Sequence, residues 1–147
     1  MLSLAHTITS LPLAVYLDNP ILIFFTAILL HLLMDSIYHW NVDPNDGGTY
    51  PYAAAFIDVT IGIIGAQYII GESFFTWKVL AAIAGGNMPD ILHSIWFQLG
   101  PNYRPNWLLK LKPVFDFHEK IQFETRQIIP GLIPQAVVIL MAIYLLP

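Results

Sequence analysis

Residues 29–40 read LLHLLMDSIYHW and place His31, Asp35 and His39 at intervals of four. Helical residues four apart lie on one face, so a helix here would carry all three on a single stripe. The surrounding segment, residues 20–40, contains no other charged residue and is about long enough to cross a bilayer. Ionisable side chains are costly in such a helix and are rare there without a function. The stripe therefore predicts a membrane helix with a functional site on it.

The composition of the whole chain favours a membrane protein. Hydrophobic residues make up 56% of the 147 residues and charged residues 11%, whereas soluble domains carry about 25% charged residues. We therefore expect one membrane-embedded domain over residues 1–147, with the lipid bilayer as its partner. The chain has no cysteine, which excludes disulfides, thiolate metal sites and a cysteine nucleophile. The small net charge of -4 and the lack of a basic run argue against a nucleic-acid partner.

Five apolar segments predict the fold, an all-α integral membrane bundle of about five helices. They cover residues 2–17, 20–40, 52–70, 75–99 and 131–146. Because proline removes a helical hydrogen bond and clashes with the preceding turn, we expect the fourth helix to be kinked or broken at Gly85–Pro89. Residues 114–128 predict a short amphipathic surface helix, and residues 41–51 form a loop dense in turn-forming residues.

The positive charges give an orientation for this bundle. All six Lys and Arg residues lie at position 78 or between 104 and 126. If five segments cross, five of these charges share a side with the N-terminus, and that side is then cytoplasmic. At 1.5 Å per residue, most of the histidines and buried aspartates fall within about 15 Å of this face. We therefore expect a polar layer near the cytoplasmic side of a bacterial or archaeal inner membrane.

The side chains in this layer are types that bind metal ions. We expect five ligands, and these are His31, Asp35, His39, Asp90 and His93. Three further residues, Asp58, His6 and His118, are additional ligands or orient the others. His31 and His39 lie about 12 Å apart on a straight helix, too far to share one ion. Asp35, which lies between them, could bridge two metals. Alternatively, one pair of the three residues binds a single ion and the third residue orients a ligand.

Each residue also has a less specific interpretation. His6 could be an interface residue, His39 an interfacial histidine and His118 a surface one, while Asp58 could accept hydrogen bonds from an unsatisfied backbone. Asp35 and Asp90 are the hardest to explain by packing alone. Mixed His and Asp ligands suit a divalent metal, Zn²⁺ first, with Mn²⁺ or Fe²⁺ as alternatives.

These ligands predict metal-assisted hydrolysis, with Asp35 and Asp90 as the catalytic carboxylates. A bound metal would acidify water and polarise a carbonyl or phosphoryl oxygen. A lipid or phosphoester substrate fits a site at this depth. Two other functions stay open. A metal-ion or proton transporter would need polar residues along the whole path, such as Gln67 and Glu72. A structural protein would use the metal only to hold a small bundle together.

Three short motifs resemble the membrane-bound metal-dependent hydrolases, also described as LexA-binding, inner membrane-associated hydrolases. The similar residues are His6 in LAHTITS, the segment GGNMPDILH that ends at His93, and His31 to Asp35 in HLLMD. The chain departs from the family pattern at two places: it lacks the further histidine-rich segment, for which the nearest substitute is FDFHEKIQ with His118, and Ile91 stands where the family often has aspartate. The resemblance implies a small multi-helix membrane protein with metal-dependent hydrolase activity.

Overall fold

The computed structural model describes residues 1–41 and 50–147, and in these residues the fold is all-α. The long helices are α1 (Ser3–Tyr16), α2 (Pro20–Asp35), α3 (Tyr50–Ile70), α4 (Trp77–Gln98) and α7 (Ile128–Tyr144). They correspond to the five predicted segments, so the all-α prediction is confirmed. The loop predicted at residues 41–51 lies for the most part outside the described residues.

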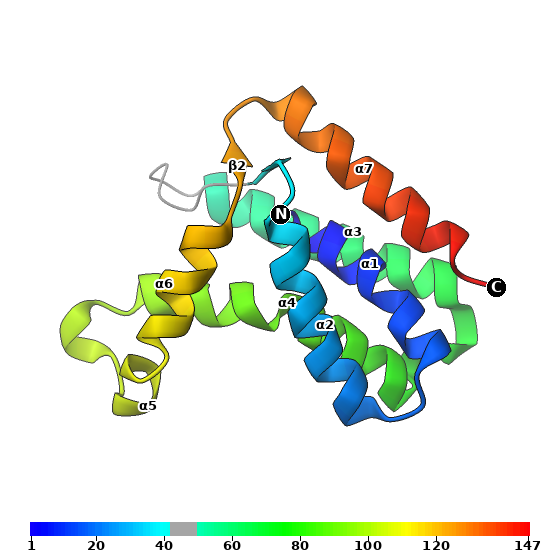
Figure 1. Ribbon diagram of the computed structural model, residues 1–147, viewed down its shortest axis with the longest axis horizontal. Coiled ribbons are helices and arrows are strands. Elements are labelled where there is room, and N and C mark those ends of the chain that lie inside the picture. The colour runs from blue at the N-terminus through cyan, green and yellow to red at the C-terminus, as the bar shows by residue number, and fades with distance from the viewer. Residues whose placement is uncertain (42–49) are drawn as a thin grey trace.

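Shorter elements connect the long helices. They are β1 (His39–Trp40), η1 (Gly71–Phe75), η2 (Pro101–Tyr103), α5 (Asn106–Leu109), α6 (Lys112–Ile121) and β2 (Glu124–Thr125). Figure 1 shows α5 and α6 projecting from one side of the bundle, while α7 runs back along it. The predicted amphipathic helix at residues 114–128 is therefore shorter in the structure, where α6 ends at Ile121 and β2 follows.

A bundle of five membrane-spanning helices is not shown. In the described residues, one stretch is long and apolar enough to cross a membrane, the 23 residues Ala53–Phe75 in α3 and η1. Helices α2 and α7 are apolar but have 16 and 17 residues, respectively. The segment predicted at residues 20–40 splits because its helix ends at Asp35.

Pairing with a distant segment ends α2 early. The amide of Phe123 donates to the carbonyl oxygen of Asp35 at 3.0 Å, and the amide of His39 donates to the carbonyl oxygen of Phe123 at 3.1 Å. Strands β1 and β2 then pair in parallel, with His39 opposite Glu124. The prediction that His39 shares a helical stripe with His31 and Asp35 is therefore wrong, because long-range pairing replaces the last helical turns.

Two adjacent glycines let α4 pass close to both α1 and α2. A Cβ on Gly85 would collide with the carbonyl oxygen of Phe24 in α2, and one on Gly86 with Ser10 Oγ in α1. Helix α4 continues through Pro89 without interruption, so of the two outcomes predicted at Gly85–Pro89, a break is wrong and a kink stays a prediction. Small residues at helix contacts allow such close backbone approach, and here they bring Asp90, one turn further on, toward α2.

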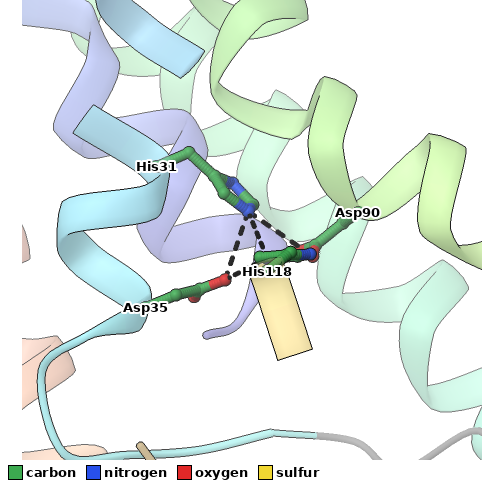
Figure 2. A group of neighbouring side chains, drawn as sticks. All are labelled: His31, Asp35, Asp90 and His118. Atoms are coloured by element: carbon green, nitrogen blue, oxygen red, sulfur yellow. Dashed lines mark hydrogen bonds and ion pairs between the residues drawn. The ribbon is translucent and has the colours of Figure 1, made fainter. Parts of the chain in front are cut away.

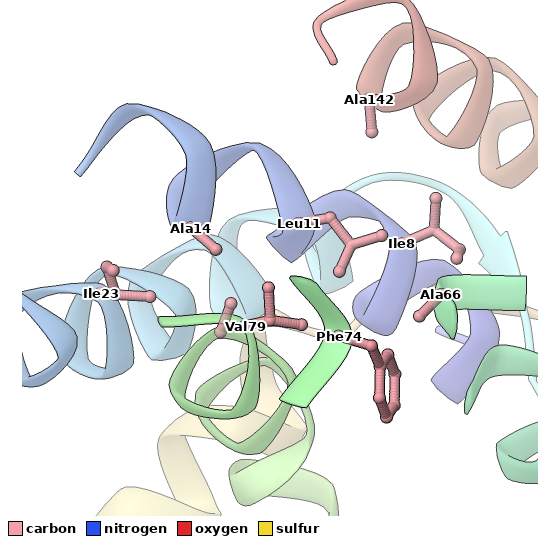
Figure 3. Close-up of a cluster of buried hydrophobic side chains, with 9 residues drawn as sticks. Ile8, Leu11, Ala14, Ile23, Ala66, Phe74, Val79 and Ala142 are labelled. Atoms are coloured by element: carbon pink, nitrogen blue, oxygen red, sulfur yellow. The ribbon is translucent and has the colours of Figure 1, made fainter. Parts of the chain in front are cut away.

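The apolar core occupies one end of the bundle, opposite the polar residues. Figure 3 shows side chains from α1, α2, α3, η1, α4 and α7 meeting there. The core members include Leu11, Ile23, Val79 and Ala142. Leu11 lies in the second half of α1, Ile23 and Val79 lie in the first halves of α2 and α4, and Ala142 lies near the end of α7. The opposite halves of α1, α2 and α4 carry His6, His31, Asp35, Asp90 and His93.

Candidate metal centre

Four side chains from three helices form a compact buried group, which we call the His/Asp group. His31 and Asp35 come from α2, Asp90 from α4 and His118 from α6, and one ligand atom of each lies within 4.8 Å of the others. Figure 2 shows the four side chains pointing toward one another. His31, Asp35 and His118 are at most 2% exposed. The structure thus brings together two helical neighbours and two residues that are distant in sequence.

Asp35 is the centre of the group. Its Oδ2 lies 2.8 Å from His118 Nε2 and 3.2 Å from His31 Nε2. The Asp90 carboxylate lies on the other side of both histidines, with its Oδ1 at 3.5 Å from His31 Nε2 and 3.8 Å from His118 Nε2. Ligands bound to one ion at about 2.0–2.2 Å lie roughly 3–4 Å apart. The four atoms therefore have the spacing of a first coordination shell.

The backbone of α4 fixes the orientation of the His31 ring. His31 Nδ1 lies 2.7 Å from the carbonyl oxygen of Gly86, which can only accept a hydrogen bond, so Nδ1 carries a proton. In the neutral ring, the lone pair of Nε2 then faces Asp35, Asp90 and the Nε2 of His118, 3.2 Å away. A set of acceptors facing one another needs a positive charge between them, either a proton or a metal ion. Metal-binding histidines commonly have this arrangement, with the second nitrogen donating to a carbonyl.

Packing against α4 places His118 in the group. The ring of Phe115 lies 5.1 Å from Trp96 and 5.5 Å from His93, centroid to centroid, and Leu108 completes this small apolar cluster. Helix α6 is thereby fixed against the second half of α4, and His118 lies one turn after Phe115. Gln122, one further turn along the same helical face, approaches Asp35 Oδ2 at 3.4 Å. Sequence reasoning missed Gln122, although its spacing of four from His118 was a signal for it.

His6 lies beside the group. Its ring stacks on His31, with 3.8 Å between the centroids, and its Nε2 lies 3.1 Å from Asp35 Oδ1. The side chain is 1% exposed, and neither ring nitrogen forms a hydrogen bond within the described residues. The structure thus agrees with the prediction that His6 belongs to the same layer as His31 and Asp35.

Two other predicted site residues have different partners. Asp58 accepts hydrogen bonds from the amides of Ser3 at 2.6 Å and Leu4 at 3.2 Å, which makes it a cap for the N-terminus of α1. His93 Nε2 lies 3.3 Å from Glu119 Oε1. The group therefore includes neither Asp58 nor His93, and the alternative interpretation of Asp58 as a backbone acceptor fits its contacts.

His39 lies at the edge of the site. Its Nε2 is 3.9 Å from Asp35 Oδ1, 3.8 Å from Glu124 Oε1 and 2.8 Å from the α-amino nitrogen of Met1. The same amino group lies 2.6 Å from Asp35 Oδ1. Hydrogen bonding to His39 is the main reason why the pKa of the Glu124 carboxyl lies below its ordinary value. Partial burial acts in the opposite direction, and a hydrogen bond from Asn41 lowers the pKa further. His39 is therefore an outer neighbour of Asp35.

A cleft of about 1000 Å³ leads to Asp90, which is 29% exposed. Its polar lining comes mainly from α4, α6 and β2 and includes Asp90, His93, Glu119 and Glu124. Its apolar lining comes from α3 and α4 and includes Val59, Ile63, Ile91 and Ile95. The His/Asp group is thus buried on one side and accessible on the side of Asp90.

No family model, curated protein or solved structure matches this chain. The interpretation of the site therefore depends on its geometry and chemistry.

Proposed function

We propose that the chain is a membrane-bound metal-dependent hydrolase whose His/Asp group holds one divalent metal. The observation that carries the proposal is the orientation of His31. Its Nδ1 is committed to the carbonyl of Gly86, so Nε2 is the ring atom that faces the two carboxylates and the second imidazole, and a metal ion would supply the positive charge between them. Two histidines and two carboxylates at this spacing suit Zn²⁺, with Mn²⁺ or Fe²⁺ as alternatives.

The accessibility of Asp90 supports a catalytic role for the metal. Structural metal sites are closed, whereas catalytic sites keep a position open for water or substrate. Asp90 is 29% exposed and lines the cleft, while Asp35 is fully buried. A metal held here would supply an acidified water and a Lewis acid at the inner end of the cleft. Asp35 would anchor the site, and Asp90 would face the substrate.

The exposed surface of the bundle supports a membrane location. Only 11% of the apolar 18-residue window in Ala53–Phe75 is buried inside the protein. A core helix of a soluble protein would instead be mostly buried. Large apolar side chains of α2 and α7 also point outward, and they include Leu29, Leu33, Ile133 and Leu140. Apolar surfaces this extensive need a bilayer or a protein partner to cover them.

The charge distribution supports a site at the cytoplasmic side. Five of the six basic residues lie between Arg104 and Arg126, the segment that includes α6 and therefore His118. The positive-inside rule places this segment in the cytoplasm. The inner membrane of a bacterium or archaeon remains the location we propose, in line with the family resemblance of the sequence motifs.

The cleft favours an amphiphilic substrate, such as a lipid with an ester or phosphoester bond. Its apolar lining would accept an acyl chain, and its polar lining would bring the bond to be cleaved to Asp90. The test is to incubate the purified protein with Zn²⁺ or Mn²⁺ and phospholipid in mixed micelles, and to measure the acid released. We expect release by the wild type and a loss of about 100-fold or more in Asp90→Asn. Equal rates in both proteins would contradict a hydrolytic role for this site.

A further inference from the structure

The carboxylates of Asp35 and Asp90 each present one oxygen to His31 and His118 and the other oxygen to His6. Asp35 Oδ2 and Asp90 Oδ1 face the pair His31 and His118. Asp35 Oδ1 and Asp90 Oδ2 lie 3.1 and 3.9 Å from His6 Nε2. We propose that the site binds two metal ions, the second held by His6 and these two remaining oxygens, so that both carboxylates bridge. This inference rests on the metal site proposed above.

The geometry around His6 is that of ligands sharing one ion. Two ligands on adjacent corners of a coordination polyhedron face each other across an edge of about 3–3.5 Å. The lone pair of each then points to the metal, beside the other ligand and not directly at it. His6 Nε2 meets this description, because it lies 3.1 Å from Asp35 Oδ1 yet makes no hydrogen bond of acceptable angle.

The stacking of His6 on His31 gives an independent measure of the spacing. The two rings are 3.8 Å apart and inclined by 23°, and both direct Nε2 toward the same carboxylates. Metal ions in two-metal hydrolytic sites are about 3.5–4 Å apart. Two stacked imidazoles that each bind one ion would therefore hold the ions at the separation such sites require.

Burial argues against a simple packing role for His6. Buried polar atoms are almost always hydrogen-bonded, yet neither ring nitrogen of this 1% exposed side chain has such a partner in the described residues. The charges around the site bear on a second metal ion. The amino group of Met1 lies 2.6 Å from Asp35 Oδ1, so the second metal would compete with an ammonium for that oxygen. Three further carboxylates line the cleft and would offset the charge of a second ion, namely Asp58, Glu119 and Glu124.

The experiment is a titration of the metal-stripped full chain in detergent with Mn²⁺ alone, followed by metal analysis and electron paramagnetic resonance. We expect two Mn²⁺ per chain in the wild type, with the hyperfine pattern of an exchange-coupled pair. His6→Phe keeps an aromatic ring against His31 but removes the ligand, and should bind one Mn²⁺ with an uncoupled spectrum. His93→Gln, which changes a buried histidine outside the group, should keep two.

The outcomes separate this proposal from the one before it. One uncoupled Mn²⁺ in the wild type, unchanged in His6→Phe, would overturn the second site and leave the first intact. A wild type that binds no Mn²⁺ in this titration, and no Zn²⁺ or Fe²⁺ in parallel titrations, would overturn both. If His6→Phe does not fold, the spectrum of the wild type decides alone, because a coupled pair requires two ions on shared ligands.

Discussion

His31 Nδ1 lies 2.7 Å from the carbonyl oxygen of Gly86, so the backbone of α4 orients this histidine of α2. This hydrogen bond joins α2 to α4 at the point where α4 passes closest to its neighbours. The adjacent Gly85 and Gly86 permit that approach. The packing of the helices and the chemistry of the site therefore depend on the same contact.

Gly85→Ala should weaken both the fold and the site. Its Cβ would meet the backbone of Phe24, which cannot move as a side chain can, so α4 must shift away from α2. We expect a loss of about 1–3 kcal/mol in the free energy of unfolding, together with weaker metal binding. Denaturant titration in detergent and metal analysis would measure the two effects.

Gly65→Ala is the matched control for this variant. Its Cβ would meet only Ile8 Cδ1, at the ordinary contact distance of 3.7 Å. The substitution should leave metal binding unchanged and keep or slightly raise stability, because alanine favours helix more than glycine does. Equal losses in both variants would show that the glycine pair has no special role.

Asp58→Ala should destabilise the protein without removing metal. The carboxylate accepts from the Ser3 and Leu4 amides, and loss of such a cap costs about 1 kcal/mol. Asp116→Ala is a suitable comparison, because Asp116 forms an exposed pair with Lys112 at 2.7 Å and exposed pairs contribute little. A loss of metal in Asp58→Ala would make Asp58 a ligand after all.

His93→Gln should retain the metal content of the wild type. His93 pairs with Glu119 and packs on Phe115, and no oxygen of Asp35 or Asp90 is among its described contacts. Metal analysis of the purified variant, beside His118→Gln, checks this expectation. We expect metal loss in His118→Gln alone. Metal loss in His93→Gln but not in His118→Gln would mean that His93, and not His118, is a ligand.

Helix α3 should lie in the bilayer. Because the chain has no cysteine, Ile61→Cys and Glu72→Cys each introduce a single reporter. Ile61 is 51% exposed in the middle of the apolar stretch, so it should resist a water-soluble maleimide in membrane vesicles and react after solubilisation and denaturation. Glu72 lies in η1 near the end of this stretch and should react in vesicles. Rapid labelling of both would place α3 outside the membrane.

The sequence predicted the helices better than it predicted the site. Apolar segments with turn residues between them are a local signal, and they located all five long helices. The spacing of four also paired His31 with Asp35 correctly. The position of His39 could not be predicted this way, because Phe123, 84 residues after it, pairs with the backbone of this segment.

The contribution of α6 was the least predictable part of the site. His118 stands alone between charged residues in FDFHEKIQ, and nothing local distinguishes it from a surface histidine. Aromatic packing between Phe115 and Trp96 turns it inward. A role for Asp58 as a backbone acceptor was among the interpretations of the sequence, but its partners could not be predicted, because the amides it caps belong to α1, more than 50 residues earlier.

Metal content is the most direct test of the central claim, that the His/Asp group binds a divalent metal. We would measure it by mass spectrometry on the detergent-purified wild type, Asp35→Asn and Asp90→Asn, with circular dichroism to check that each variant is folded. The account predicts at least one Zn, Mn or Fe per wild-type chain and a loss of metal in both folded variants. A wild type that carries no stoichiometric metal, even after reconstitution with each ion, would contradict it.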